Sequence, residues 1–289
     1  MNSTHLPVAW RDWIAENLAL GCDPKSLIAD MIKASFDPGY AASVVMGFAQ
    51  GKPLVEQAAA YVYEAPRIAS GNLIRTPDRD VRVTLRIERP LVVFLDDVLS
   101  HQECDELVAR SRDNLTRSTT VNPSDGKDAV IEARSSEGTF FHLNADPFIA
   151  RLDARIAALM NMPVENGEGL QILHYHTGGQ YTPHYDFFKP DEPGSQPHLA
   201  NGGQRVSSLV IYLNDVADGG ATIFPELHLQ VGPKKGGAVY FEYCNSRNQI
   251  DAMTLHGGTP VLKGEKWIAT KWMRQNRYCQ ATTNQIANS

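Results

Sequence analysis

Two side chains that can bind metal ions stand close together in the segment HYDFF, where His184 and Asp186 flank a tyrosine. Residues i and i+2 of a β-strand point to the same face, so a strand at this position would project both side chains into one cavity. A histidine and an aspartate at this spacing are a weak signal by themselves. A metal site would need a third ligand from elsewhere in the chain.

His256, in the segment MTLHGGTPV, is the candidate for that third ligand. It precedes a Gly-Gly turn and a short strand, where a side chain can point inward. Two histidines and one carboxylate on one face of an octahedral metal form the facial triad of non-haem Fe(II) oxygenases, which leaves three coordination positions for a co-substrate and O₂. The spacing alone leaves open whether the three residues meet or are a coincidence.

Lys266 follows ten residues after His256 and opens the apolar segment KWIATKWM. A lysine on a buried strand is costly unless an anion pairs with it. In a metal pocket, the distal carboxylate of a dicarboxylic co-substrate would be that anion. The alternative interpretation is that Lys266 and Lys271 are surface charges at strand ends, and it stays open for Lys271 in particular.

The other histidines give weaker signals. His174 and His176 alternate with Tyr175 and should face away from it, which favours a structural role. Polar or terminal surroundings indicate surface positions for four more: His5, His101, His198 and His228.

Composition limits the classes of protein that this chain can belong to. Its 289 residues suffice for one large domain, or for a main domain with a small one, and the net charge of −6 does not indicate a nucleic-acid-binding surface. No basic region followed by an apolar run opens the chain, and no apolar run reaches about 18 residues, so we expect neither a signal peptide nor a membrane span. The four scattered cysteines form no CxxC pair and indicate free thiols in a reducing cytoplasm.

The first part of the chain, from residue 8 to about 65, has the apolar periodicity of three or four short helices. Two of them share a start signal, an aspartate followed by Pro24 or Pro38. The segment from 65 to 80 then reads as a linker, so we expect a helical unit with its linker over 1–78 and a second domain over 79–289. The helical unit could cover part of the main domain or recognise a peptide or another partner.

Short strands dominate the second part. VRVTLRI and PLVVFLDDVL read as strands, and a capping box of Ser100 and Glu103 opens a helix after them. A polar, turn-rich segment over 122–132 has the composition of a mobile loop. Five more strands follow, separated by turns, a pattern typical of a sandwich or barrel: LQILHYH, SSLVIYLN, AVYFEY, TPVL and KWIATKWM.

Several blocks together resemble the catalytic domain of the prolyl 4-hydroxylases, which are 2-oxoglutarate- and Fe(II)-dependent oxygenases. These blocks are LQILHYHTGGQYTPHYDFF, GGQRVSSLVIYLNDVADGGATIFPE, LHGGTPVLKGEKWIATKWMR and, earlier, EARSSEGTFFHL. The resemblance runs from about Val83 to Arg277 and excludes the N-terminal helices. It implies a mainly β fold: a double-stranded β-helix (jelly roll) with flanking helices, preceded here by the small all-α unit.

The resemblance also implies roles for individual residues. His184, Asp186 and His256 would bind Fe(II), and Lys266 would bind the distal carboxylate of 2-oxoglutarate with the help of Tyr175 and Thr222. The substrate would contact Glu168, Tyr181, Arg205 and Trp272. The alternative interpretation is that Tyr181 and Trp272 are core aromatic residues and that Arg205 and Glu168 are charges at the rim. Arg274 departs from the family, because some members carry a histidine there.

We therefore predict a dioxygenase that hydroxylates a prolyl residue in a peptide or protein while 2-oxoglutarate and O₂ become succinate and CO₂, with ascorbate as reductant. One alternative is a hydroxylase of a free amino acid or other small molecule. Others are a noncatalytic peptide-binding module and a metal-dependent cupin that does not use 2-oxoglutarate, in which Lys266 would have no role. We expect no nucleic-acid or membrane partner and a cytoplasmic location; the oligomeric state stays open.

Overall fold

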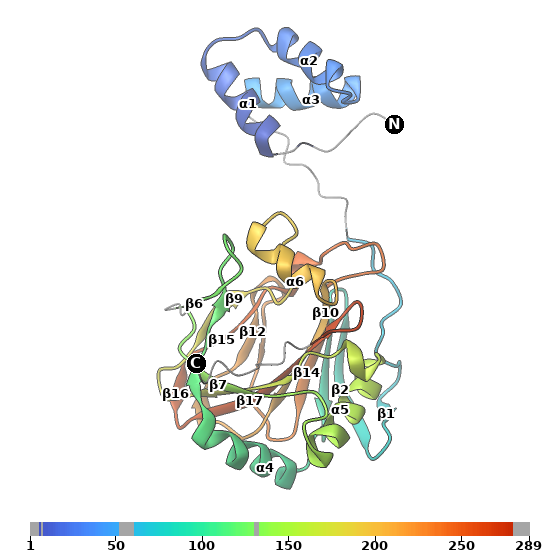
Figure 1. Cartoon of the computed structure of the whole chain (residues 1–289), viewed down its shortest axis with the longest axis vertical. Coiled ribbons are helices and arrows are strands. Elements are labelled where there is room, and N and C mark those ends of the chain that lie inside the picture. The colour runs from blue at the N-terminus through green and yellow to red at the C-terminus, as the bar shows by residue number, and fades with distance from the viewer. Residues whose placement is uncertain (1–5, 7, 52–60, 130–132, 280–289) are drawn as a thin grey trace, which may run out of the picture. The chain divides into compact units, whose positions relative to one another are not determined.

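The computed structural model describes residues 6, 8–51, 61–129 and 133–279 (Figure 1). The chain divides into two compact units, Met1–Tyr61 and Val62–Ser289. Within the described residues, none of the helices combines the length and the apolar character that a membrane crossing requires.

The first unit contains three helices, α1 (Val8–Ala19), α2 (Pro24–Lys33) and α3 (Pro38–Ala49). The predicted start signals are confirmed, since the Asp23 side chain accepts the Lys25 N–H and the Asp37 side chain accepts the Tyr40 N–H. The helices enclose a small core of buried side chains: Ile14, Leu27, Met31, Phe36, Ala41, Val44 and Val45. The predicted helical region continues into residues 52–60, which lie outside the described residues.

The segment from 65 to 80, which we expected to form a linker, belongs to the second unit, which begins at Val62. Strand β1 (Leu73–Arg75) pairs antiparallel with β2 (Asp80–Glu88), and Ile68 and Ile74 are buried in the main core. The Arg67 guanidinium lies 2.9 Å from the Glu242 carboxylate. The linker was predicted from the turn-forming residues of this segment. Residue composition does not reveal the ion pair and the edge strand that hold the segment in place.

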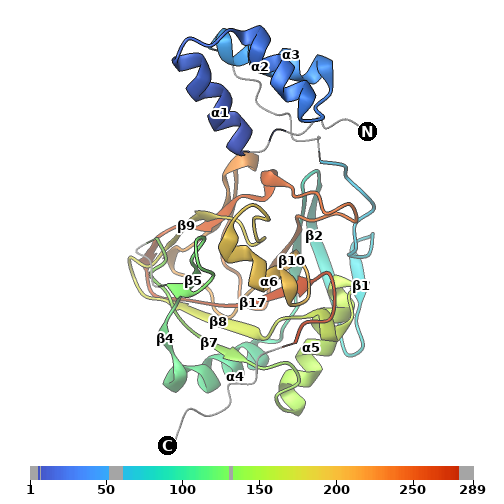
Figure 2. The same cartoon turned by 45° about the horizontal axis from the view of Figure 1, so that its top comes forward.

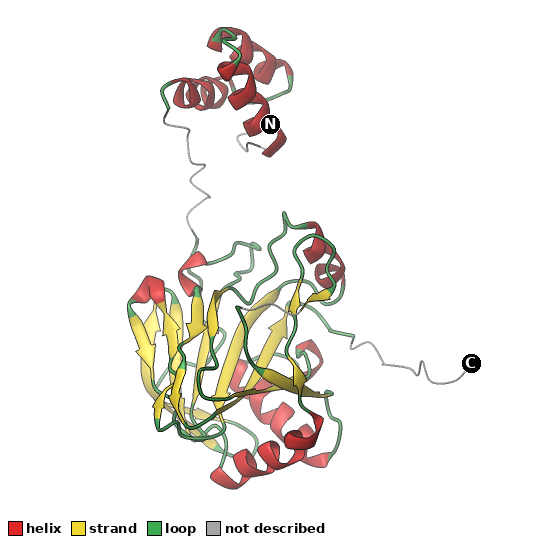
Figure 3. Ribbon diagram, turned by 90° about the vertical axis from the view of Figure 1, so that its left-hand side faces the viewer, coloured by secondary structure: helices red, strands yellow, loops and turns green. Residues whose placement is uncertain are grey.

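Among the described residues of this unit, nine strands form one antiparallel sheet in the order β1-β2-β3-β14-β10-β17-β8-β7-β4. Figure 3 shows the strands of this unit side by side, with helices packed against one end of them. Four strands form a smaller sheet in the order β13-β12-β15-β9. The large sheet adds β3 (Leu91–Asp96), β4 (Thr116–Arg117), β7 (Glu137–Phe141), β8 (Leu170–Tyr175), β10 (Arg205–Tyr212), β14 (Ala238–Glu242) and β17 (Lys266–Arg274). The smaller sheet consists of β9 (Tyr181–His184), β12 (Thr222–Phe224), β13 (Leu229–Val231) and β15 (His256–Gly258).

Two further pairs of short strands complete the β structure: β5 (Thr120–Val121) with β6 (Asp128–Ala129), and β11 (Asp218–Gly219) with β16 (Val261–Lys263). The β5–β6 hairpin occupies most of the segment that was predicted as a mobile loop, of which residues 130–132 lie outside the described residues. Helix α6 (Gln196–Ala200) lies where β10 begins (Figures 1 and 2).

Helices α4 (His101–Ser111) and α5 (Pro147–Met160) contribute to the main core. The predicted capping box at the start of α4 is confirmed by reciprocal hydrogen bonds between Ser100 and Glu103. The sequence analysis missed α5. Its start repeats the Asp-Pro signal of the N-terminal helices, because the Asp146 side chain accepts the Phe148 and Ile149 N–H groups and Pro147 follows it.

Lys271 is not the surface charge that the sequence suggested. It is fully buried, and its Nζ donates to the Asp153 carboxylate of α5 at 2.7 Å, a partner that is itself 1 % exposed. The pair joins the centre of the large sheet to α5. Removing one partner of such a pair leaves an uncompensated buried charge.

We therefore expect Lys271→Met to lower the free energy of unfolding by about 3–5 kcal/mol. The double variant Lys271→Met/Asp153→Leu should recover much of this loss, because neither charge remains. Chemical denaturation monitored by circular dichroism measures both, with the exposed Lys263→Met as the matched control. A loss for Lys271→Met no greater than that for Lys263→Met would contradict the role of the buried pair.

Candidate metal centre and co-substrate pocket

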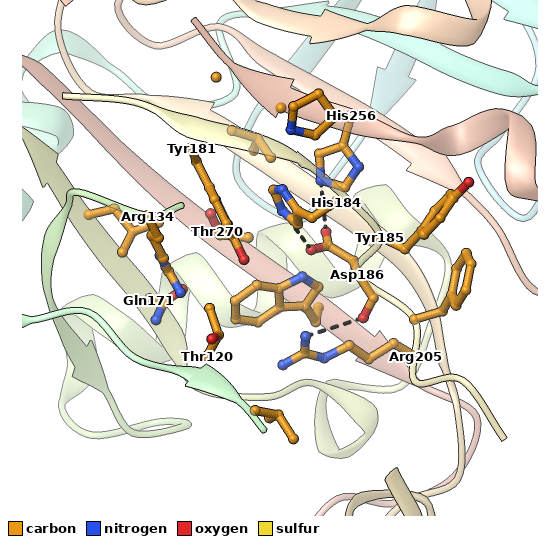
Figure 4. A pocket seen from close by; sticks show the side chains of 18 of the residues that line it. Thr120, Arg134, Gln171, Tyr181, His184, Tyr185, Asp186, Arg205, His256 and Thr270 are labelled. Atoms are coloured by element: carbon orange, nitrogen blue, oxygen red, sulfur yellow. Dashed lines mark hydrogen bonds and ion pairs between the residues drawn. The ribbon is translucent and has the colours of Figure 1, made fainter. Parts of the chain in front are cut away.

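The structure brings His184, Asp186 and His256 together at one point of a large cavity (Figure 4). His184 Nε2 lies 3.6 Å from Asp186 Oδ1, and His256 Nε2 lies 3.5 Å from Asp186 Oδ2. One ligand atom from each of the three residues lies within 4.8 Å of the other two. Three ligand atoms on one side of an open cavity are the arrangement that a facial triad requires.

The smaller sheet positions both histidines. His184 ends β9 and His256 begins β15, and the two face each other in the antiparallel register. Asp186 does not share this strand, contrary to the alternation argument, because β9 ends at His184 and the chain bends before Asp186. The bend therefore turns the carboxylate toward both imidazoles.

Each histidine is oriented to offer a lone pair to a cation. His184 Nδ1 lies 2.9 Å from the Thr182 carbonyl oxygen and His256 Nδ1 lies 3.0 Å from that of Thr254. A carbonyl only accepts, so both Nδ1 atoms carry the proton and both Nε2 atoms are free to bind a metal. Burial lowers the pKa of His256 to about 4, so this ring is neutral at pH 7.

Asp186 supplies the negative charge of the site. Burial works against its ionisation, but the interactions of the carboxylate with His256, His184 and Arg205 outweigh burial and hold the carboxyl pKa well below its usual range. Ser208 Oγ donates to Asp186 Oδ2 at 2.5 Å and lies 3.0 Å from the Tyr243 hydroxyl. Two imidazoles and one fixed carboxylate suit Fe(II) among the divalent metals.

Lys266 lies in the same cavity, at the start of β17. It is 4 % exposed, and no hydrogen bond or ion pair joins its ammonium group to any residue that the structure describes. Burial lowers its pKa to about 8. A buried ammonium group without an anionic partner is costly, so the position suits a ligand that carries an anionic group.

Tyr175 and Thr222, the other residues predicted to bind the co-substrate, line the same cavity. Tyr175 is directly opposite Lys266 in the pairing of β8 with β17. Thr222 Oγ1 accepts a hydrogen bond from the Tyr212 hydroxyl at 2.8 Å. Gly258 lies beside the ammonium group, since a Cβ there would be 3.7 Å from Lys266 Nζ, an ordinary van der Waals distance.

Three of the four residues predicted to bind substrate also line the cavity: Tyr181, Arg205 and Trp272. The Tyr181 ring stacks on His184 with 3.6 Å between ring centroids, and the Arg205 guanidinium lies 3.9 Å from the centroid of the Trp272 ring. Glu168 is buried behind them and accepts two hydrogen bonds from Arg205, at 2.6 and 2.8 Å.

Arg274, the departure from the family pattern, is 2 % exposed and shares the Glu168 carboxylate. Its guanidinium also donates to the carbonyl oxygens of His198, Asn201 and Gly203. Arg274 therefore fixes the segment between α6 and β10 rather than pointing into the cavity.

Sequence analysis missed one wall of the cavity. Arg134 lies in the block EARSSEGTFFHL, to which no role was given, and its guanidinium is 5.0 Å from the centroid of the Tyr181 ring. It donates to Ser136 Oγ, to the Thr119 carbonyl oxygen and to Gln171 Oε1. The signal in the sequence was the block itself, which resembles the family and lies just before the jelly roll, where an arginine can tie a loop to a strand.

Comparison with known proteins agrees with this geometry. The model of the 2OG-Fe(II) oxygenase superfamily matches residues 170–274, which include the triad and Lys266. Prolyl 4-hydroxylase 5 of Arabidopsis thaliana is 36% identical over 208 residues, which cover 65% of this chain and 70% of that protein. The chain belongs to the prolyl 4-hydroxylase family of 2-oxoglutarate- and Fe(II)-dependent oxygenases.

Two other relatives support the assignment. The prolyl 4-hydroxylase subunit alpha-1 of Rattus norvegicus is 35% identical over 188 residues, but only 35% of that longer protein is covered. A viral collagen prolyl hydroxylase from Paramecium Bursaria Chlorella virus-1, solved as a 2OG complex, matches 63% of this chain and 95% of its own with a TM-score of 0.51 and 28% identity. The predicted jelly-roll fold and the predicted class of 2-oxoglutarate- and Fe(II)-dependent dioxygenase are thus confirmed.

The geometry of the triad predicts how metal binding responds to substitution. His184→Ala or His256→Ala should each remove one equivalent of bound Co(II), a spectroscopic substitute for Fe(II), because two ligands do not hold the ion. Calorimetric titration of the metal-free protein measures the number of equivalents, and His228→Ala is the control. Unchanged stoichiometry in both variants would exclude this triad as the metal centre.

Proposed function

We propose that this chain hydroxylates a prolyl residue within a peptide or protein, with conversion of 2-oxoglutarate and O₂ to succinate and CO₂. The observation that carries the proposal is the pairing, within one cavity, of an oriented His-Asp-His triad with the unpartnered Lys266 ammonium group. A metal-dependent cupin that does not use 2-oxoglutarate would have no use for this lysine. A noncatalytic peptide-binding module would need neither feature.

The residues would divide the work as follows. His184, Asp186 and His256 would hold Fe(II), and Lys266 would bind the distal carboxylate of 2-oxoglutarate beside Tyr175 and Thr222. When bound, Fe(II) with 2-oxoglutarate and O₂ supplies the oxidising chemistry that inserts one oxygen atom into a C–H bond. The Asp186 carboxylate offsets part of the charge of the ion, and Ser208 keeps that carboxylate in place.

A prolyl ring fits the substrate side of the cavity, which has a volume of about 590 Å³. A pyrrolidine ring packs well on aromatic side chains. The aromatic residues that line the cavity near the triad are Tyr181, Tyr185, Phe187, Phe188 and Trp272. The lining also includes Pro123 and Glu192, and the volume of the cavity exceeds that of a single amino acid. The names of the relatives, prolyl 4-hydroxylase and collagen prolyl hydroxylase, agree with a peptidyl substrate.

Two finer points belong to the same proposal. Ascorbate would act as the reductant that keeps the iron in the Fe(II) state, as the resemblance to the family implied. A reducing compartment such as the cytoplasm is supported by the four cysteines, all of them free thiols.

One assay tests the proposal directly. With Fe(II), ascorbate and 2-oxoglutarate, we expect succinate formation to rise when a proline-containing peptide is added, and the peptide to gain one oxygen atom by mass spectrometry. The same peptide with alanine in place of proline, and the Asp186→Ala enzyme, are the matched controls. Oxygen transfer to free proline but not to peptides would favour the small-molecule alternative, and no succinate above the Asp186→Ala level would rule out the oxygenase.

Lys266 should make 2-oxoglutarate binding depend on pH. Its pKa is about 8 without ligand, and a bound carboxylate raises that pKa. Affinity should therefore be constant below about pH 8 and fall by up to about tenfold per pH unit above it. Calorimetry with Mn(II) in the triad measures this, and Lys266→Arg, which stays charged, should remove the decline.

Removal of the charge gives the complementary result. We expect Lys266→Ala to weaken 2-oxoglutarate binding at least about thirtyfold, or ~2 kcal/mol, because the carboxylate loses its buried partner. Metal binding should persist, and the exposed Lys263→Ala should bind like the wild type. Loss of the metal with retained 2-oxoglutarate affinity would contradict the role given to Lys266.

A further inference from the structure

A second group of side chains that can bind a metal lies apart from the triad, and the proposed reaction does not use it. One ligand atom from each of Glu137, His174 and His176 lies within 4.8 Å of the other two. Glu137 in β7 is directly opposite His174 in β8. Because Tyr175 between the two histidines lines the cavity, the histidines lie on the opposite face of the sheet, as their alternation predicted.

His174 provides the observation that points to a ligand. It is 5 % exposed, and its Nε2 lies 2.8 Å from Glu265 Oε2. A carboxylate accepts hydrogen bonds, so Nε2 carries the proton and Nδ1 carries the lone pair. This Nδ1 is buried and has no hydrogen-bond partner among the described residues.

A lone pair that is buried without a donor costs free energy, and a bound cation would satisfy it. The arrangement, with a carboxylate on one ring nitrogen and a free lone pair on the other, is the one in which metal-binding histidines are held. Trp267 stacks on the imidazole with 4.0 Å between centroids and further fixes the ring.

His176 and Glu137 offer the other two ligands from the solvent side. His176 Nε2 lies 3.6 Å from Glu137 Oε2, close to the separation of about 3.4 Å expected for two ligands of a tetrahedral metal. The His174 and His176 rings meet edge to face with 4.2 Å between centroids. Arg112, the nearby cation, lies 3.7 Å from the other oxygen of Glu265 and so pairs with the orienting carboxylate rather than with a ligand.

We propose that Glu137, His174 and His176 form a second metal site that takes a Zn(II)-type ion, with Glu265 as the residue that orients His174. Imidazole and carboxylate ligands in tetrahedral geometry suit Zn(II), and a water molecule would complete the coordination. The site is structural. It joins β7 to β8 directly behind Tyr175 and, through Glu265, reaches the start of β17 beside Lys266, so a bound ion would brace the strands that carry the co-substrate pocket.

Calorimetric titration of the full-length, metal-free chain with Zn(II) tests the proposal. We expect two equivalents for the wild type, one for His184→Ala, one for His176→Ala and none for the double variant. His176 is exposed and Glu137 is half-buried at the surface, so His176→Ala and Glu137→Gln should fold normally, and the exposed His101→Ala is the matched control.

The two sites fail separately, so the result is unambiguous. If His184→Ala binds no Zn(II), or if His176→Ala still binds two equivalents, the second site does not exist. If His176→Ala binds no Zn(II) while His184→Ala still binds one equivalent, the triad does not bind Zn(II) and the second site remains supported.

Glu265 distinguishes an orienting carboxylate from a bystander. In the His184→Ala background, Glu265→Ala should weaken Zn(II) binding about 10- to 100-fold, whereas Glu265→Gln, whose amide oxygen still accepts the Nε2 proton, should recover most of the affinity. Equal affinity in all three proteins would overturn the role of Glu265. Succinate formation by His176→Ala should equal that of the wild type at saturating 2-oxoglutarate, because the second site does not touch the reacting groups.

Discussion

The oxygenase unit depends on one buried carboxylate. Asp186 is 8 % exposed and must stay ionised, so it needs partners from other segments of the chain. The smaller sheet brings two imidazoles from segments 72 residues apart to face it, and the larger sheet supplies the Ser208 hydroxyl. Both sheets must form before the carboxylate is satisfied, which makes the metal centre a product of the whole jelly roll rather than of the local motif.

The pairing of β8 with β17 has a similar consequence for the co-substrate pocket. Its register sets Tyr175 opposite Lys266 on one face and His174 opposite Trp267 on the other. One pair of strands therefore fixes the polar end of the cavity and the orientation of the outer histidine together. A shift of one residue in this register would move Tyr175 and Lys266 out of the cavity and turn His174 and Trp267 toward it, because side chains alternate between the two faces of a strand.

Local chemistry explains what could be predicted from the sequence. Asp23, Asp37 and Ser100 cap helices through hydrogen bonds to residues two or three positions away, so their signals are complete within a few letters. Asp146 gives the same signal for α5 and was overlooked among the strands. His184, Asp186 and His256 could be grouped from the sequence because His184 and Asp186 stand two positions apart and His256 precedes a Gly-Gly turn, and the resemblance then implied the same three residues. The argument from strand alternation was wrong in detail, since a bend orients Asp186.

What the sequence could not show are the partners of buried charges. Lys271 looks like a strand-end lysine, yet it pairs with Asp153 across the core, 118 residues away. Arg274 uses Glu168 together with carbonyl oxygens of an irregular segment, and backbone acceptors leave no trace in residue type. Glu168 also holds Arg205 beside Trp272. Arg274 therefore influences the substrate side of the cavity only through the carboxylate that it shares with Arg205. A change of residue there would shift the wall of the cavity without altering a group that faces it.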